Sequence, residues 1–264
     1  MELWAKKSLG QHFLNSPAAL AHIVEAGKLS ASDLVLEIGP GTGILTEALL
    51  ATGARVIAVE KDDRAYELLQ TKCAAAISEG KLVLRHGDIL ESDRVALGLA
   101  DGSYKLIANI PYYITGQILE TFLEYSPRPS TIIVLVQKEV AERIVARDGK
   151  ESILSISVKA FGTPRIVAKV PRGAFVPPPT VDSAILEISN ISAAAFTQNS
   201  IDIRRFFEIV KAGFAHKRKI LRKNLFGIAS DDKIAVAWLN TGLNDKSRAE
   251  DLTPDQWMGI SKNL

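Results

Sequence analysis

Short runs of apolar, often β-branched residues alternate with amphipathic stretches along the first 190 residues of the chain. Strand patterns that alternate with helix patterns are typical of βα units and of a largely parallel sheet. The helices predicted between the strands cover residues 43–50, 65–76, 116–123 and 138–145. The predicted strands cover 34–38, 55–60, 82–86, 104–108, 131–137, a long segment within 152–170, and 181–188.

The pattern changes near residue 190. Beyond it, β-branched runs become scarce, and apolar residues recur at helical spacing to the end. Residues 190–200 are small and polar and include three consecutive alanines, so we expect a linker there. A chain of 264 residues is long enough for one or two domains. We therefore predict an α/β domain with a Rossmann-like sheet over 1–190 and a small helical domain over 191–264.

The composition is that of a globular protein without membrane spans. Hydrophobic residues make up 47% of the chain, charged residues 23%, and no apolar run approaches the ~18 residues of a spanning helix. The single cysteine, Cys73, cannot form an intramolecular disulfide or a multi-cysteine metal site, and residues 1–4 contain no apolar signal core. We therefore expect a cytoplasmic monomer with no metal ligands and no membrane partner.

Positive charge is concentrated in one window of the chain. The formal net charge is only +2, yet the window 204–223 contains eight basic residues against one acid, Glu208, and so carries +7. Segregated charge of this kind favours binding to a polyanion. The basic residues are Arg204, Arg205, Lys211, Lys217, Arg218, Lys219, Arg222 and Lys223.

A glycine-rich turn, residues 39–43, follows the first predicted strand and precedes a helix. Glycines permit unusual backbone angles and let a ligand approach the main chain closely. The spacing is Gly-x-Gly-x-Gly, whereas dinucleotide-binding enzymes have Gly-x-Gly-x-x-Gly. The turn therefore predicts a nucleotide-like ligand but disfavours a nicotinamide dehydrogenase.

Acidic residues stand at the ends of the next two predicted strands, Glu60 and Asp88. A carboxylate in the position of Glu60 can accept both hydroxyl protons of a ribose, as in NAD-type and S-adenosylmethionine-type sites. A carboxylate beside a hydrophobic residue, as Asp88 is beside Ile89, suits the amine and flat face of an adenine. Gly39, Glu60 and Asp88 together predict an adenosine pocket at the carboxyl edge of the sheet.

The sequence Asn109-Ile110-Pro111-Tyr112 follows the fourth predicted strand. An aromatic exocyclic amine is hard to methylate because its lone pair is delocalised into the ring. The Asn109 side-chain oxygen and the Ile110 carbonyl can accept the two amine hydrogens and turn the lone pair toward a sulfonium methyl. Tyr112 can stack on the base, so catalysis would rest on orientation and electrostatics without a covalent intermediate.

Six motifs occur in order along nearly the whole chain: KSLGQHFL at 7–14, EIGPGTG at 37–43, NIPY at 109–112, QKEVAER at 137–143, FVPPPTVDSA at 175–184 and FAHKRKILR at 214–222. With these motifs the chain closely resembles the small-subunit ribosomal RNA adenine N6,N6-dimethyltransferases, relatives of the antibiotic-resistance methylases of large-subunit RNA. The resemblance implies a Rossmann-like, S-adenosylmethionine-dependent enzyme that dimethylates two adjacent adenosines of small-subunit (16S) ribosomal RNA in a pre-ribosomal particle.

The resemblance also implies roles for particular residues. Asn109 and Tyr112 would act on the target adenine, and Phe175 would pack on the opposite face of a base taken out of its stack. The family often has asparagine in place of His12, and a smaller polar residue is frequent at Tyr113. The residues implied to contact the cofactor are His12, Leu14, Gly39, Gly41, Glu60, Asp88 and Asn109.

If residues 203–225 form one helix, its apolar residues fall on one stripe and its basic residues on an adjoining stripe. Beside an adenine-methylating site, this basic stripe predicts phosphate binding, which Lys6 and Lys7 would extend. RNA shape and the flipped base would then provide specificity, with the basic surface setting the register. The predicted RNA-binding residues are Arg204, Lys211, Lys217, Arg218, Lys219, Arg222 and Lys223.

Two alternatives to a small-subunit dimethyltransferase remain besides the dehydrogenase. A large-subunit (23S) RNA methylase that confers macrolide resistance shares the catalytic motif and differs in its substrate. A non-catalytic RNA-binding assembly factor could have the same fold, but the presence of Asn109, Tyr112, Glu60 and Asp88 disfavours it.

Overall fold

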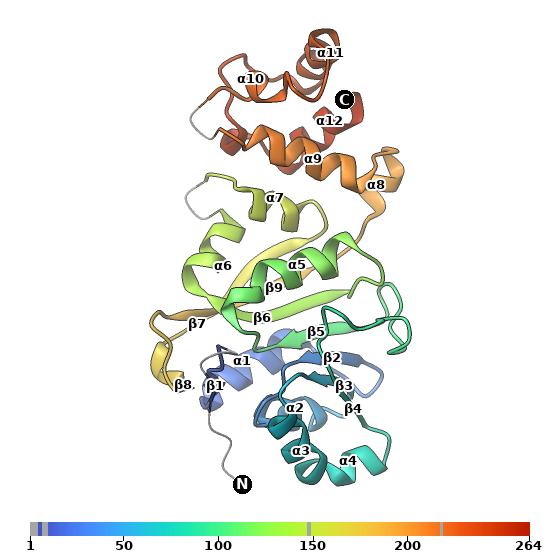
Figure 1. Ribbon diagram of the computed structural model, residues 1–264, viewed down its shortest axis with the longest axis vertical. Coiled ribbons are helices and arrows are strands. Elements are labelled where there is room, and N and C mark those ends of the chain that lie inside the picture. The colour runs from blue at the N-terminus through green and yellow to red at the C-terminus, as the bar shows by residue number, and fades with distance from the viewer. Residues whose placement is uncertain (1–4, 7–9, 147–148, 217–218) are drawn as a thin grey trace. The chain divides into compact units, whose positions relative to one another are not determined.

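The computed structural model describes residues 5–6, 10–146, 149–216 and 219–264 (Figure 1). The chain divides into two compact units, one of residues 1–141 and 164–191 and one of residues 142–163 and 192–264. The segment 142–163, which the sequence places in the first domain, thus groups with the C-terminal residues. The cause is packing between segments distant in sequence: the Ser192 N–H donates to the Phe161 carbonyl at 2.9 Å, and the rings of Phe161 and Phe196 stack with centroids 4.9 Å apart.

A seven-stranded sheet forms the centre of the first unit, in the order β4-β3-β2-β5-β6-β9-β7. β2 to β6 pair in parallel, and β9 pairs antiparallel with β6, which confirms the predicted α/β fold with a Rossmann-like sheet. The inner strands are buried along most of their length, as expected for a parallel sheet covered on both faces. The strands are β2 (Leu34–Ile38), β3 (Arg55–Glu60), β4 (Leu82–His86), β5 (Lys105–Ala108), β6 (Thr131–Gln137), β7 (Thr163–Val170) and β9 (Ser183–Ser189).

A second, two-stranded sheet joins the N-terminal segment to the proline-rich loop. β1 (Phe13–Leu14) pairs antiparallel with β8 (Phe175–Val176), so that Leu14 stands opposite Phe175. The Asn15 N–H extends this contact by donating to the Ala174 carbonyl at 2.7 Å. Segments about 160 residues apart in sequence therefore lie side by side next to the main sheet.

The helices of the first unit pack on its sheet. α1 contacts β5, β6, β9 and α2, while α3 contacts β3 and β4. The predicted helices are confirmed within a few residues, except that 65–76 is divided between α3 and α4. The helical elements here are α1 (Pro17–Gly27), α2 (Ile44–Leu50), α3 (Asp63–Lys72), α4 (Ala74–Ser78), η2 (Tyr112–Ile114), α5 (Thr115–Glu124), α6 (Lys138–Val145), which continues into the second unit, and η3 (Arg172–Ala174).

The prediction of one long strand segment within 152–170 is wrong for its first half, which forms the helix α7. Its β-branched residues resemble a strand, but Ser152 and Ser155 form a capping box that starts a helix. Ile156 and Val158 then bury one face of α7, which contacts α9. Local capping and burial outweigh strand propensity here.

The second unit is helical in the described residues beyond 192, as predicted. Aromatic residues make much of its core: Phe206 meets Phe196 and Phe207 edge to face, and Trp257 is fully buried. Its helices are α7 (Ile153–Lys159), α8 (Ala194–Gln198), α9 (Ile203–Gly213), α10 (Leu221–Leu225), α11 (Asp231–Thr241), η4 (Ala249–Asp251) and α12 (Pro254–Asn263).

The prediction of one helix over 203–225 is wrong, because α9 ends at Gly213 and α10 begins at Leu221. A Cβ on Gly213 would stand 2.4 Å from the Trp257 ring and 2.8 Å from the Leu221 side chain, so α10 packs against the end of α9 where glycine leaves room. Asn224 stabilises this break, since its Nδ2 donates to the Gly213 carbonyl at 2.6 Å. The predicted apolar stripe is nevertheless largely buried, divided between the two helices.

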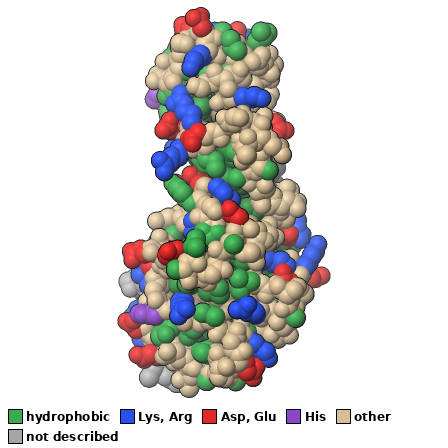
Figure 2. Space-filling view, turned by 90° about the vertical axis from the view of Figure 1, so that its right-hand side faces the viewer, with side chains coloured by type: hydrophobic (Ala, Val, Ile, Leu, Met, Phe, Trp, Pro, Cys, Tyr) green, Lys and Arg blue, Asp and Glu red, His purple; other side chains and the backbone are tan. Residues whose placement is uncertain are grey.

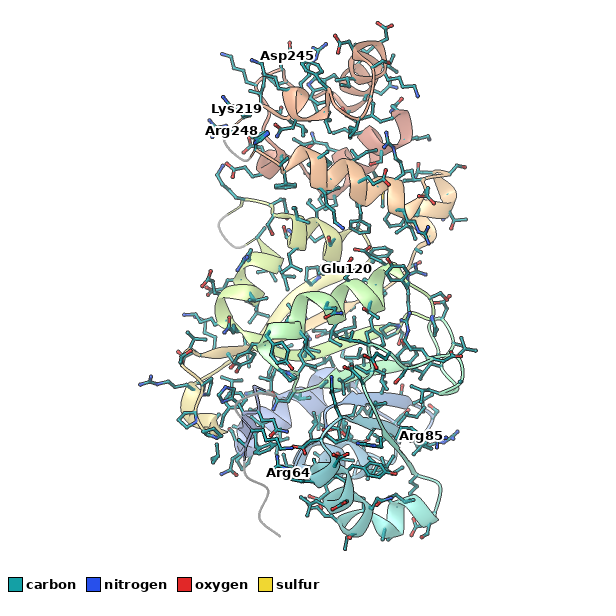
Figure 3. All side chains as sticks on the ribbon, viewed as in Figure 1. Arg64, Arg85, Glu120, Lys219, Asp245 and Arg248 are labelled. Carbon is teal, nitrogen blue, oxygen red and sulfur yellow. The ribbon has the colours of Figure 1, made fainter. Side chains whose placement is uncertain are left out.

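The predicted RNA-binding residues therefore lie on two helices and the turn between them. Lys217 and Arg218 lie outside the described residues, and Arg222 pairs with Asp245 at 3.0 Å. The Leu221 N–H donates to the Ser247 carbonyl, which places the loop 244–248 beside α10 and brings Lys219 and Arg248 to the same side of this unit (Figure 3). Of the predicted RNA-binding residues that the structure describes, Arg222 is half-buried and the others are exposed to solvent, namely Arg204, Lys211, Lys219 and Lys223.

Charged side chains of both signs are interspersed over the face of the molecule shown in Figure 2, with apolar side chains between them. Within the described ranges, none of the helices combines the length and the apolar composition that crossing a membrane requires.

Candidate active site

A cavity of about 440 Å³ lies at the carboxyl ends of β2, β3, β4 and β5. Open α/β sheets bind their ligands at this edge, and the volume suits a nucleoside with a short side chain. Most of the residues that line the cavity end these strands, follow them directly or belong to the N-terminal segment 10–14. All the predicted cofactor residues line it, namely His12, Leu14, Gly39, Gly41, Glu60, Asp88 and Asn109.

The glycine loop after β2 has backbone angles that favour glycine. Gly39, Gly41 and Gly43 have φ of +64°, +56° and +78°. A Cβ on Gly41 would stand 3.0 Å from the Phe13 ring, and one on Gly43 would stand 2.6 Å from the Leu69 side chain. The loop therefore passes closely between the N-terminal segment and α3, and larger residues would displace it from the cavity.

Glu60 ends β3 in the cavity with 4% of its surface exposed. Its Oε2 accepts the N–H of Gly41 at 2.9 Å, and its Oε1 accepts the N–H of Asp62 at 2.8 Å. Burial raises the pKa of Glu60, although the two N–H groups lower it in part. Each oxygen has a further lone pair, so Glu60 can hold the glycine loop and still accept hydrogen bonds from ribose hydroxyls.

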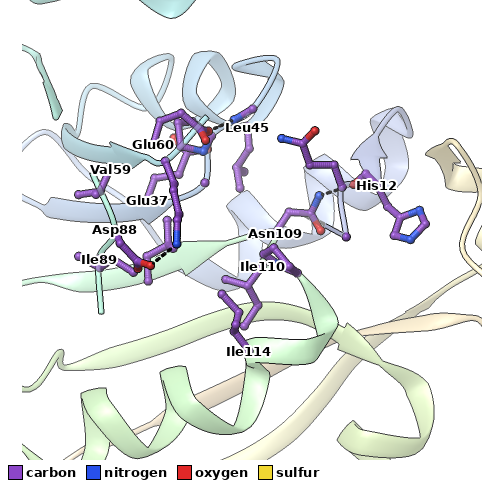
Figure 4. A pocket seen from close by; sticks show the side chains of 18 of the residues that line it. His12, Glu37, Leu45, Val59, Glu60, Asp88, Ile89, Asn109, Ile110 and Ile114 are labelled. Carbon is purple, nitrogen blue, oxygen red and sulfur yellow. Dashed lines mark hydrogen bonds and ion pairs between the residues drawn. The ribbon is translucent and has the colours of Figure 1, made fainter. Parts of the chain in front are cut away.

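Asp88 forms an ion pair with Lys61 at the cavity wall (Figure 4). The Lys61 Nζ donates to Oδ2 at 2.7 Å, and the Leu90 N–H donates to Oδ1 at 2.9 Å. Burial opposes ionisation of Asp88, but these two donors lower its pKa below the usual value. An ionised acceptor therefore stands beside Ile89, as an adenine amine requires. Lys61 was not among the predicted site residues, and only its position next to Glu60 could have indicated it.

Glu37 is a second buried carboxyl in the cavity wall that the sequence did not single out as a site residue. It is 1% exposed, and the Thr46 hydroxyl donates to its Oε2 at 2.7 Å. Burial and the charge of Glu60 raise its pKa to about 8, against a smaller lowering by Thr46. Glu37 is therefore largely protonated at neutral pH, and it ties β2 to the first turn of α2.

Asp62 joins the N-terminal segment to the loop after β3. Arg64 donates to both of its carboxylate oxygens, Gln11 Nε2 donates at 3.1 Å, and Lys6 Nζ lies 3.4 Å away. The Arg64 guanidinium holds the pKa of Asp62 well below its usual range. The buried carboxylate thus holds Lys6 and Gln11, and Gln11 lines the cavity. Sequence spacing gave no sign of this contact, which joins positions more than 50 residues apart.

Asn109 stands at the end of β5, between the cavity and the N-terminal segment. Its Nδ2 donates to the His12 carbonyl at 3.0 Å. A backbone carbonyl can only accept, so the amide nitrogen must face His12 and Oδ1 is directed to the other side. Oδ1 is the acceptor atom of this amide, and its use as an acceptor for an amine stays a prediction.

Tyr112 follows in η2 and is held by a residue distant in sequence. Its hydroxyl lies 2.5 Å from the Oγ of Ser183, which is fully buried at the start of β9. Burial raises the pKa of Tyr112, and the bond to Ser183 offsets part of that rise. Ser183 belongs to the proline-rich motif, but a separation of 71 residues gave no indication that it meets Tyr112.

Phe175 does not reach the cavity. It is 2% exposed and belongs to the core of the first unit, where β8 pairs it with Leu14. The predicted sandwich of a base between Tyr112 and Phe175 is therefore not formed in this structure and stays a prediction for the RNA-bound protein. Tyr113, in contrast, is 69% exposed at the cavity rim.

The largely parallel sheet, the cavity at its carboxyl edge and the Asn-Ile-Pro-Tyr turn after β5 are the features expected of an S-adenosylmethionine-dependent methyltransferase that acts on an amine. The family model of ribosomal RNA adenine dimethylase matches residues 3–264. This chain belongs to the ribosomal RNA adenine dimethylase family.

Individual relatives agree with this family. The chain is 41% identical to the Ribosomal RNA small subunit methyltransferase A of Dehalococcoides mccartyi, over 97% of this chain and 87% of the relative. A solved structure of a dimethyladenosine transferase from Plasmodium falciparum aligns with a TM-score of 0.77 at 26% identity, covering 94% and 96% of the two chains. The 23S rRNA methyltransferase ErmE aligns with a TM-score of 0.73 at 24% identity, covering 96% and 99%, which shows a common fold.

The cavity residues are suited to S-adenosylmethionine, the cofactor of this family. Glu60 and Asp88 are acceptors at neighbouring strand ends, and the glycine loop leaves the main chain accessible between them. Bound there, the cofactor would supply an electrophilic methyl group on its sulfonium.

Proposed function

We propose that this chain transfers methyl groups to N6 of two adjacent adenosines of small-subunit (16S) ribosomal RNA, twice per adenosine, in a pre-ribosomal particle. The observation that carries the proposal is the orientation of Asn109, whose Nδ2 is engaged by the His12 carbonyl so that Oδ1 remains as the acceptor. The likeness to the D. mccartyi small-subunit methyltransferase supports the choice of RNA.

In the proposed mechanism, the chain orients the target amine and the cofactor separately. Glu60 and Asp88 would hold the cofactor through its ribose and adenine, and Asn109 Oδ1 together with the Ile110 carbonyl would accept the two amine hydrogens. This grip directs the nitrogen lone pair out of the ring plane, while Tyr112 stacks on the base. No strong general base is needed, since the proton leaves the amine for solvent after methyl transfer.

The basic residues of the second unit are proposed to bind RNA phosphates. Arg204, Lys211, Lys219 and Lys223 are exposed there, and Arg222 lies among them on α10. Phosphate contacts of this kind provide affinity and register without reading sequence. We further propose that the protein acts in the cytoplasm as a monomer.

The large-subunit alternative shares the fold but has weaker support. ErmE, a 23S methyltransferase, resembles this chain at 24% identity, whereas the relative named for the small subunit reaches 41%. The non-catalytic alternative is disfavoured because Asn109, Tyr112, Glu60 and Asp88 all line one cavity.

The test is methylation of small ribosomal subunits from cells that lack this activity. Purified protein with tritiated S-adenosylmethionine should label the small-subunit RNA, and nucleoside analysis should find N6,N6-dimethyladenosine. The Asn109→Ala variant should lose transfer and retain part of its cofactor binding, because it loses the amine acceptor and only one of the seven residues predicted to contact the cofactor.

Large-subunit RNA serves as the matched substrate control. Labelling of that RNA in preference to small subunits would support the large-subunit alternative. Monomethyladenosine as the sole product, or full turnover by Asn109→Ala, would contradict the proposed reaction.

A further inference from the structure

We infer that His12 is a positioning residue for the target adenine rather than a side-chain contact of the cofactor. This inference rests on the proposed function and concerns the same cavity. His12 is the residue at which this chain departs from the asparagine often found in the family it resembles. Its backbone and its ring contact three different parts of the proposed adenine site.

The first contact is made by the His12 backbone. Its carbonyl accepts from Asn109 Nδ2 at 3.0 Å and so determines which way the amide faces. The flanking backbone is itself held in place, because Phe13 and Leu14 pair with Val176 and Phe175 in the two-stranded sheet. The acceptor that grips the amine is thus oriented by a segment that cannot move independently of the proline-rich loop.

The second contact joins the imidazole to that loop. His12 Nδ1 lies 2.8 Å from the Pro177 carbonyl. Since a carbonyl only accepts, Nδ1 must carry the proton and donate it, so the neutral ring has Nε2 as its free acceptor. The side chain therefore has a defined tautomer and a defined direction.

The third contact is with Tyr112. The two rings stack at 21° with their centroids 5.9 Å apart, while Ser183 holds the tyrosine hydroxyl from the other end. The imidazole thus supports the ring on which the base is proposed to stack. Figure 4 shows it directed away from Glu60 and Asp88, the two acids proposed to hold the cofactor.

In these contacts the His12 backbone and the His12 ring have different roles: the backbone carbonyl orients Asn109, and the ring contacts Tyr112 and the Pro177 carbonyl. Replacing the side chain leaves the His12 carbonyl and its bond to Asn109 in place but removes the support of Tyr112 and the bond to Pro177. Cofactor affinity should therefore change little, whereas Tyr112 should position the target base less accurately and kcat should fall. A side-chain contact to the cofactor would give the opposite pattern.

The experiment compares His12→Ala, His12→Asn and His12→Phe with the wild type, and uses His22→Ala as the matched control because His22 is exposed on α1. Calorimetric titration should show a cofactor Kd within about threefold of the wild type, and kcat at saturating RNA and cofactor should fall by about tenfold or more for His12→Ala and His12→Asn. His12→Phe retains a stacking ring and should recover part of kcat.

A cofactor Kd raised by about tenfold, or a kcat for His12→Ala within about twofold of the wild type, would overturn the inference. Both results count against the inference only if the wild type forms dimethyladenosine in the same assay. Its failure to do so would count against the proposed function instead.

Nitrogen-15 spectra of the imidazoles test the geometry without activity. The protein alone should show His12 as the Nδ1–H tautomer, with ring-proton shifts that move toward those of His22 in Tyr112→Leu. An Nε2–H tautomer, or shifts unaffected by Tyr112→Leu, would overturn the inference whatever RNA the enzyme modifies.

Discussion

Glu37 shows how the environment of one residue determines its chemistry. It occupies a strand end beside the glycine loop, but it is fully buried next to Glu60 and accepts from the Thr46 hydroxyl. Glu60 in turn receives two backbone N–H groups. Burial raises the pKa of both carboxyls, and Glu60 has two backbone donors that oppose this rise where Glu37 has the Thr46 hydroxyl.

The free energy of unfolding should depend on pH through the titration of the Glu37 carboxyl. Burial raises its pKa in the folded protein to about 8 from the usual 4.5, so between these values the folded state binds more protons than the unfolded state. Stability contributed by the protonated carboxyl is therefore lost as pH rises from about 5 to 8, by an amount that corresponds to a few kcal/mol. The Glu37→Gln variant, neutral at all pH, should lack this loss.

Thermal unfolding at pH 5 and pH 8 measures this effect. When the pH is raised from 5 to 8, the Tm of the wild type should fall by several degrees relative to the Tm of Glu37→Gln. Glu25→Gln, on the exposed face of α1, is the matched control and should follow the wild type. A wild type that gained stability relative to Glu37→Gln on raising the pH would contradict the pKa of Glu37.

Residues that follow strands could be predicted as site residues, whereas their supports could not. Glu60, Asp88 and Asn109 stand at strand ends, and parallel pairing brings such ends to one edge. Ser183 and Asp62 act through partners far away in sequence, for which periodicity carries no signal. The burial of Phe175 also depends on β1 pairing with β8, a contact that local pattern does not encode.

At the scale of elements, hydrophobic periodicity located most strands and helices of the first unit within a few residues, but it missed α7 and the break between α9 and α10. The strand 131–137 was predicted to the residue, since its apolar run is bounded clearly on both sides. For the helix predicted over 203–225, the sequence gives no sign of a break, because the apolar period continues through Gly213, where α9 ends. The Trp257 ring, which comes from another helix, occupies the space beside Gly213, the last residue of α9.

Gly213→Ala should therefore destabilise the second unit. A Cβ there would stand 2.4 Å from Trp257 and 2.8 Å from Leu221, closer than van der Waals contact allows. Overpacking of this kind costs about 1–3 kcal/mol, so we expect Tm to fall by several degrees. Gly227→Ala, where a Cβ would meet nothing within 4 Å, is the matched control in a thermal melt. Equal melting of both variants would show that the end of α9 tolerates a side chain.

At the scale of the whole molecule, the near-neutral net charge of +2 averages over two different sites. The acids Glu60 and Asp88 belong to a cavity that needs acceptors, while the window 204–223 belongs to the second unit. Composition predicted the basic window but not its division between two helices, nor the pairing of Arg222 with Asp245. Mutations in the basic window should therefore change RNA binding without changing cofactor binding.

The double variant Lys219→Ala/Lys223→Ala tests this separation. Two lost phosphate contacts should reduce the slope of log Kd for RNA against log salt by about 1.5, because fewer counterions are released on binding. Cofactor Kd and kcat at saturating RNA should stay at wild-type values, since both lysines lie outside the cavity. The control Arg55→Ala/Lys81→Ala removes two exposed cations at the amino ends of β3 and β4, away from the cavity, and should leave the slope unchanged. Equal slopes for both double variants would mean that Lys219 and Lys223 do not contact phosphate.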